Sequence, residues 1–240
     1  MAFPLSESTF GWTAVPRSQP ALYKSTSKAN SKPFSPHEVK LPSSPVAVQT
    51  HEYAKANLPE KTFNHSMRVF LYGIGVLAQH LSNYPAPNSL IETYFLACLL
   101  HDIGTTSNNM DHTRLSFELQ GAVLALDLLR KFGAPDDQAE LVAEIVNRHQ
   151  DLGDTGSVPL LLGLTLTTTI FVVDNVGENA DLVHPDTIKA VTTAYPRNKW
   201  SGCFAETVRK EISKKPWSHS TVIENFAETV EGNKLMEPYD

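Results

Sequence analysis

The sequence predicts an all-helical fold, and two patterns indicate it. From about residue 49 onward, apolar residues recur at three- and four-residue spacing, and no convincing alternation of apolar and polar residues appears. Before that point, seven of the sixteen prolines fall in a stretch rich in serine and lysine. Because proline fixes its backbone and lacks an amide donor, this stretch is predicted to be extended or looped. We therefore expect a largely non-helical arm over 1–48 and an all-helical domain over 49–240.

The arm is expected to lie against the helical domain as a wrap. Residues 10–16 read Phe-Gly-Trp-Thr-Ala-Val-Pro, which is too apolar for a tail in solvent. The predicted architecture is therefore a helical bundle with an extended, proline-rich N-terminal arm packed on it.

Eight helices are predicted within the domain. Proline suits the first turn of a helix, so Pro59 and Pro135 indicate helix starts, and Gly133 separates two helices. The predicted ranges are 58–82, 89–103, 114–132, 135–150, 158–178, 186–195, 202–213 and 219–231.

Composition bounds the class of protein. A chain of 240 residues with 41% hydrophobic residues can bury one sizeable core. Its net charge of -6, with scattered lysines and arginines, argues against a nucleic-acid or anionic-membrane surface. The two cysteines lack metal-ligand spacing and are expected to be reduced. No apolar stretch is long enough for a membrane span. We therefore expect a cytoplasmic protein without a nucleic-acid or membrane partner.

The adjacent pair His101 and Asp102 is the most informative feature for function. Neighbouring residues on a helix point roughly 100° apart, so the two can serve one site only where a helix ends. Gly104 is predicted to provide that end, because glycine accepts the left-handed conformation. Taken alone, the pair is explained more simply as a buried ion pair, or as a histidine that satisfies helix carbonyls.

Two further residues strengthen the interpretation of a metal site. His65 shares a helical face with Val69 and Val76, so its imidazole is predicted to point into the core. Asp174 continues an apolar stripe on a later predicted helix, and a buried carboxylate requires a cation or a proton. The alternatives are a hydrogen-bonded core histidine at His65 and an arginine such as Arg68 as the partner of Asp174.

Together, His65, His101, Asp102 and Asp174 provide two nitrogen and two oxygen ligands from three predicted helices. This set suits one divalent transition ion, zinc, ferrous iron or manganese. With this order of residues in an all-helical chain, the sequence resembles the HD-domain metal-dependent hydrolases over roughly residues 50 to 180.

More segments resemble the fungal cyanamide hydratases, a branch of that superfamily, and they span most of the chain, including the arm. The resemblance implies a zinc-containing lyase that adds water to cyanamide to give urea, with the four residues named above as zinc ligands. The segments are Gly-Trp-Thr-Ala-Val-Pro at 11–16, Asn-His-Ser at 64–66, His-Asp-Ile-Gly-Thr-Thr at 101–106, Ser-Phe-Glu at 116–118 and Arg-His-Gln-Asp-Leu-Gly at 148–153.

The residues after the His-Asp pair favour hydration over phosphate hydrolysis. Many HD phosphohydrolases place a lysine there, whereas residues 105–109 of this chain are neutral. The nearby basic candidates Arg68, Arg114 and Arg148 are few for a nucleotide polyanion. An HD phosphohydrolase acting on a nucleotide or other phosphoester stays as one alternative, and a non-catalytic metal-bearing helical sensor as another.

For hydration, we expect metal-bound hydroxide to attack the nitrile carbon, after which the nitrile nitrogen gains a proton and the isourea tautomerises to urea.

His149 closes an apolar helical face and is the predicted proton shuttle. Gln150 or Asp151 is expected to hold its tautomer or to bind the substrate amine. Glu118 is a further catalytic candidate. The alternatives are that His149 caps its own helix or binds a second metal, and that Glu118 is a surface or helix-dipole carboxylate.

Thr105, Asn108 and His112 are expected to contact the substrate, although a solvated position is the simpler interpretation of His112.

Small-substrate enzymes of this kind often assemble, so we expect a homo-oligomer. The remaining histidines have no carboxylate or histidine at ligand spacing, and the sequence assigns them no role: His37, His51, His80, His184 and His219.

Overall fold

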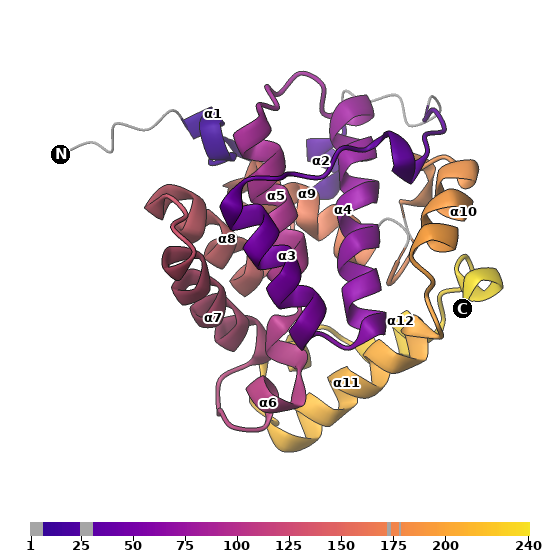
Figure 1. The fold of residues 1–240 in the computed structure, drawn as a ribbon. Helices are drawn as coiled ribbons and strands as arrows, with labels where there is room; N and C mark the ends of the chain where they lie inside the picture. The colour runs from indigo at the N-terminus through magenta and orange to yellow at the C-terminus, as the bar shows by residue number, and fades with distance from the viewer. Residues whose placement is uncertain (1–6, 25–30, 172–173, 178) are drawn as a thin grey trace.

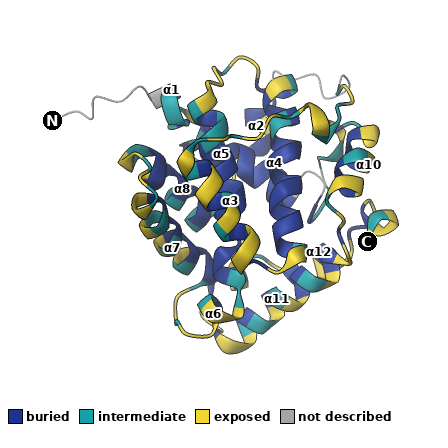
Figure 2. Cartoon of the chain, in the orientation of Figure 1, coloured by how far each residue is buried: buried dark blue, intermediate teal, exposed yellow. Residues whose placement is uncertain are grey.

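Helix α4 (Glu60–His80) runs through the bundle, and most of its residues are buried (Figures 1 and 2). Helices α3 (Pro45–Asn57), α5 (Asn88–Leu100) and α9 (Leu160–Leu166) pack around it. The computed structural model describes residues 7–24, 31–171, 174–177 and 179–240. Within these residues, helices form all of the regular structure except one small sheet, so the all-helical prediction is confirmed.

The other helices surround this centre. Helices α7 (Phe117–Lys131) and α8 (Asp136–Arg148) form an antiparallel pair on one side, and α11 (Trp200–Lys214) with α12 (Phe226–Glu231) covers one end (Figure 1). The remaining helical elements are α1 (Glu7–Phe10), α2 (Gln19–Leu22), η2 (Pro36–Glu38), η3 (Ile103–Thr105), α6 (Ser107–Met110), η4 (Thr167–Phe171), η5 (Ala180–Leu182), α10 (Pro185–Ala194), η6 (His219–Val222) and η7 (Glu237–Tyr239).

The N-terminal arm packs on the bundle, as predicted. Strand β1 (Ala14–Pro16) pairs antiparallel with β2 (Ser157–Pro159), and Val15 is buried between the arm and the bundle. Just before the strand, the Trp12 indole donates to the carbonyl oxygen of Asp137 over 3.0 Å. These contacts attach the arm to the start of α8 and to the segment before α9.

Two predicted helices differ from the structure, and one helix was missed. The range 158–178 begins as strand β2, becomes α9 and continues as the π-helix η4, while 172–173 and 178 lie outside the described residues. Threonine hydroxyls in this segment donate to carbonyls one turn back, which loosens a helix. The range 219–231 is divided by Asn225, whose φ of 51° interrupts the helix. Helix α3 was not predicted.

Gly104 does not end its helix in the way predicted. Helix α5 already ends at Leu100, and Gly104 is absent from the described residues that have a positive φ. A Cβ at Gly104 would instead meet the carbonyl oxygen of Phe117. Glycine is therefore needed because the start of α7 approaches the backbone here. Gly133, with a φ of +85°, does separate α7 from α8 as predicted.

Within the described part of the chain, every helix is too short or too polar to cross a membrane.

Replacing Gly104 with alanine is expected to lower the free energy of unfolding by about 1–3 kcal/mol, because the new methyl group would press on backbone. Gly202→Ala is the control. Its surroundings in α11 are open, so we expect a gain of about 0.4–1 kcal/mol there. Chemical denaturation of both variants measures the difference, and equal stabilities would contradict the close approach.

Candidate metal centre

His101 and Asp102 reach one site because α5 ends immediately before them. Leu100 is the last residue of the helix, and Asp102 precedes the tighter turn η3. His65 projects toward the pair from α4. One ligand atom from each of His65, His101 and Asp102 lies within 4.8 Å of the others, and all three side chains are buried. This group can hold a divalent metal ion.

The hydrogen bonds of His101 prepare one ring nitrogen for a metal. Its Nδ1 donates to the carbonyl oxygen of Cys98 over 2.8 Å. Because a carbonyl only accepts, Nδ1 carries the hydrogen, and Nε2 of the neutral ring presents a lone pair. That Nε2 atom and both carboxylate oxygens of Asp102 are buried without a hydrogen-bond partner among the described residues. Such a cluster of unpaired acceptors fits a bound cation.

His149 faces the same space from the end of α8. Its Nδ1 donates to the carbonyl oxygen of Val146 over 2.8 Å, so the predicted capping alternative is observed for one nitrogen. The other nitrogen, Nε2, has no partner among the described residues and lies 3.8 Å from Oδ1 of Asp102. Burial, together with the nearby His101, lowers the pKa of His149 to about 4. A neutral imidazole with a free lone pair therefore points into the centre.

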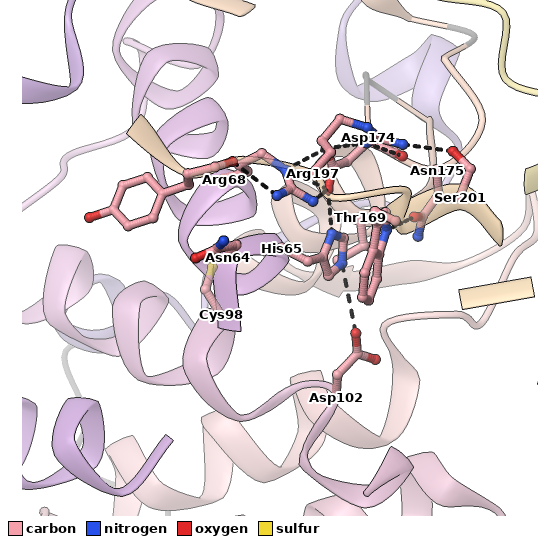
Figure 3. A network of polar contacts seen from close by, with 12 residues as sticks. Asn64, His65, Arg68, Cys98, Asp102, Thr169, Asp174, Asn175, Arg197 and Ser201 are labelled. Carbon is pink, nitrogen blue, oxygen red and sulfur yellow. Dashed lines mark hydrogen bonds and ion pairs between the residues drawn. The ribbon is translucent and has the colours of Figure 1, made fainter. Parts of the chain in front are cut away.

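Asp174 is not part of the ligand group. Its carboxylate lies beyond His65 and accepts the hydrogen of His65 Nδ1, so that the imidazole stands between Asp174 and Asp102 (Figure 3). Arg68 Nε donates to Asp174 Oδ1 over 2.9 Å, and Arg197 Nη1 donates to the same oxygen over 2.7 Å. The arginine alternative is therefore what the structure shows, with a second arginine added.

The charges in the centre follow from these contacts. Burial acts to raise the pKa of Asp102, but His101 and the other two histidines outweigh it and hold this pKa below its usual value. Burial acts in the same direction on Asp174, and Arg68 with Arg197 keeps its pKa well below the usual range. Both carboxylates are therefore ionised at neutral pH.

The two residues after His149 have different surroundings. Gln150 is buried, and its Oε1 lacks a hydrogen-bond partner among the described residues. Asp151 turns away instead. Its carboxylate pairs with Arg17 from the arm and with Arg148 from α8. The prediction that Asp151 holds His149 is therefore corrected, because two arginines draw its side chain toward the surface.

Glu118 is buried, which removes the surface alternative, and it lies in the first turn of α7, where the helix-dipole alternative still applies. It is only 1% exposed, at the start of α7. Oε1 contacts His219 Nδ1 at 3.1 Å, while Oε2 is buried without a partner among the described residues. The Phe117 ring next to it makes an edge contact with His149, with ring centroids 5.7 Å apart. Glu118 is also near enough to His149 to act on the pKa of that imidazole, which it shifts upward against the larger effect of burial.

The three predicted substrate contacts are not grouped around the centre. Asn108 and His112 are exposed on α6 and the connection after it, and their contact with the substrate stays a prediction from sequence. Helix α6 turns Asn109 inward instead, where its amide donates to the Ile103 carbonyl over 2.8 Å. Thr105 is half-buried, and its hydroxyl donates to the backbone carbonyl of Asp102 over 2.7 Å, which stabilises the turn at the metal group.

Sequence reasoning missed the contribution of the C-terminal segment. Trp200 stacks on His65 with ring centroids 4.3 Å apart, and Phe204 stacks on Trp200 at 5.3 Å. Trp200 also donates to Asn175 Oδ1 over 2.9 Å, which fixes the indole. The two aromatic residues share one face of α11, but that spacing is equally typical of an ordinary core helix. Nothing local in the sequence indicated a metal centre as their partner.

Comparison with known proteins identifies the class. The model of the HD domain family matches residues 62–184, a range that contains His65, His101, Asp102 and Asp174. The chain therefore belongs to the HD-domain family.

Two curated relatives are more specific. Cyanamide hydratase DDI2 and cyanamide hydratase DDI3, both from Saccharomyces cerevisiae, are each 38% identical to this chain over 226 residues. Each alignment covers 93% of this chain and 96% of the relative, so the similarity includes the arm and the C-terminal segment.

Replacing Asp174 with asparagine is expected to lower the free energy of unfolding by about 3–5 kcal/mol, because two buried arginines lose their shared counter-charge. Asp136→Asn, which breaks an exposed pair with Arg130, is the control and should cost at most about 1 kcal/mol. Denaturation curves of both proteins provide the comparison. The same Asp174 variant tests its role at the metal, because a complete loss of metal would support the direct ligand predicted from sequence.

Proposed function

We propose that this chain is a hydro-lyase that adds water to cyanamide to give urea. This activity is supported by two relatives named cyanamide hydratase, each of which aligns with nearly the whole chain. The observation that carries it is the buried, unpaired acceptor set on Asp102 and His149, where His149 Nε2 lies 3.8 Å from Asp102 Oδ1, with further buried, unpaired acceptors on Gln150 and Glu118. Cyanamide is small and neutral, and its amine supplies the hydrogen-bond donors that such a centre lacks.

The proposed cofactor is one zinc ion per chain, held by His65, His101 and Asp102. The donor set is equally suited to iron or manganese, and the buried unpaired atoms fit a bound cation. A divalent ion bound here would polarise the nitrile and lower the pKa of water toward neutrality. Asp174, bonded to the opposite nitrogen of His65, is proposed to orient that imidazole.

The side chains of this centre then perform the proton transfers. His149 Nε2 accepts a proton from the attacking water as the water oxygen bonds to the nitrile carbon. The imidazolium returns that proton to the nitrile nitrogen, which gives isourea. Moving the hydroxyl proton of isourea to its imine nitrogen gives urea, so no net proton enters or leaves. Gln150 Oε1 and Glu118 Oε2 are proposed to accept hydrogen bonds from the substrate amine.

The phosphohydrolase alternative has little support, because the nearby arginines are engaged elsewhere. Arg68 pairs with Asp174, and Arg148 pairs with Glu144 and Asp151. Arg114 is exposed. A phosphoryl group would therefore meet acceptor atoms without a cationic clamp. The homo-oligomer and the cytoplasmic location stay predictions from sequence.

Metal analysis tests the ligand assignment. His101→Ala and Asp102→Ala are each expected to contain less than one ion per chain, because either change removes a ligand from a three-residue group. His37→Ala, at an exposed histidine, should keep the wild-type content. Elemental analysis of the purified proteins measures this. Full occupancy in both ligand variants would refute the assignment.

Turnover of cyanamide tests the reaction, with urea as the measured product and phosphate release from nucleotides as the competing activity. Phosphate release without urea would overturn the proposal. His149→Ala is expected to lose about 10²–10⁴-fold in turnover while keeping its metal, because it removes the base and not a ligand. A sensor that keeps the metal for structure alone would be unaffected by this change.

A further inference from the structure

We propose that His219 is a positioning residue that holds the Glu118 carboxylate in the orientation needed for hydration. This inference rests on the proposed function, because it concerns a side chain assigned there to the substrate amine. His219 lies in η6, beyond residue 184, where the HD-domain match ends.

The first step is the way the C-terminal segment holds the start of α7. Glu211 Oε1 accepts the backbone N–H of Phe117 over 2.7 Å, and its Oε2 accepts the hydroxyl of Ser220 over 2.7 Å. The backbone N–H of His219 donates to Ser116 Oγ over 2.9 Å. Residues 116–118 are therefore fixed from both sides by backbone and side-chain bonds of the segment 211–220.

The second step is the environment of Glu118. A carboxylate that is almost fully buried needs a hydrogen-bond donor or a positive charge beside it to offset the loss of water. His219 Nδ1 lies 3.1 Å from Glu118 Oε1 and can supply both, which leaves Oε2 without a partner among the described residues. The His219 ring is 33% exposed, so solvent can share its charge. The hydrogen bond thus joins the buried Glu118 carboxylate to a His219 ring whose positive charge solvent can share.

The third step is the charge around His219. The hydrogen bond to Glu118 raises the pKa of His219, and the nearby Asp151 and Glu211 act in the same direction, while burial opposes them. All three carboxylates favour the protonated form of this ring. An imidazolium makes a stronger hydrogen bond to a carboxylate than a neutral ring does.

A merely structural role for His219 can be separated from positioning. The backbone bond to Ser116 and the two bonds of Glu211 do not involve the His219 side chain, so they survive its replacement. Asparagine places its amide nitrogen near the position of Nδ1 and keeps a donor without the charge. Alanine removes both.

The test compares His219→Ala, His219→Asn and Val222→Ala, the last being an exposed residue of the same turn that serves as a control. We expect His219→Ala to lower kcat for urea formation about 10- to 100-fold, which corresponds to losing one hydrogen bond to a charged group. Metal content and thermal stability should stay near wild type. His219→Asn should recover most of the activity, and Val222→Ala should match wild type.

Two results would overturn the proposal: unchanged kcat in His219→Ala, or equal losses in the alanine and asparagine variants. If wild-type protein makes no urea, the proposed function fails instead, and crystal structures of the same variants decide the question of His219. Glu118 should leave its position in His219→Ala and keep it in His219→Asn. An unmoved carboxylate in the alanine variant would exclude positioning whatever the reaction is.

Discussion

Two arginines and a histidine converge on the buried carboxylate of Asp174. Moving these charged side chains out of water costs free energy. The attraction between the carboxylate and its partners offsets that cost only if both arginines and the histidine are in place. Arg68 comes from α4, whereas Arg197 precedes α11 and also binds Asp240 at the end of the chain over 2.7 Å. This one carboxylate therefore connects the central helix with the C-terminal segment. Since His65 donates to the same carboxylate, any shift of these partners is transmitted directly to the metal group.

The ligand group lies within the HD-domain range, yet parts of the chain outside that range help to hold it. Arg17 of the arm binds both the carboxylate and the backbone of Asp151, two residues after His149, which faces the centre. On the other side, Trp200 stacks on His65. The arm and the C-terminal segment thus enclose a core whose ligands they do not supply. This explains in physical terms why similarity to the curated relatives extends over nearly the full chain.

The sequence predicts well those structural features that depend on a repeated apolar pattern or on neighbouring residues. Long helices such as α4 have a strong apolar period, and a helix end close to His101 and Asp102 was expected from the adjacent ligands, although α5 ends at Leu100 and not at Gly104. Helix α3 escaped prediction because small residues, Ala47 and Ala54, form part of its buried face, although Ser44 caps its start. The sheet escaped because each strand has only three residues. The sequence predicted that Asp174 needs a cation beside it. It could not decide between a metal ion and an arginine, because Arg197 reaches Asp174 through a contact between residues that are distant in the sequence.

The chemistry of the unpaired atoms limits what the centre can accept. The carboxylate oxygens of Asp102, the Oε2 atom of Glu118 and the Oε1 atom of Gln150 are acceptors, as is Nε2 of a neutral His149. A phosphoryl group would add more acceptors and negative charge to this set, which costs free energy unless cations compensate. A bound metal ion compensates for only part of it. A neutral molecule that carries an amine beside an electrophilic carbon complements both the acceptors and the metal group, and that is the description of the proposed substrate.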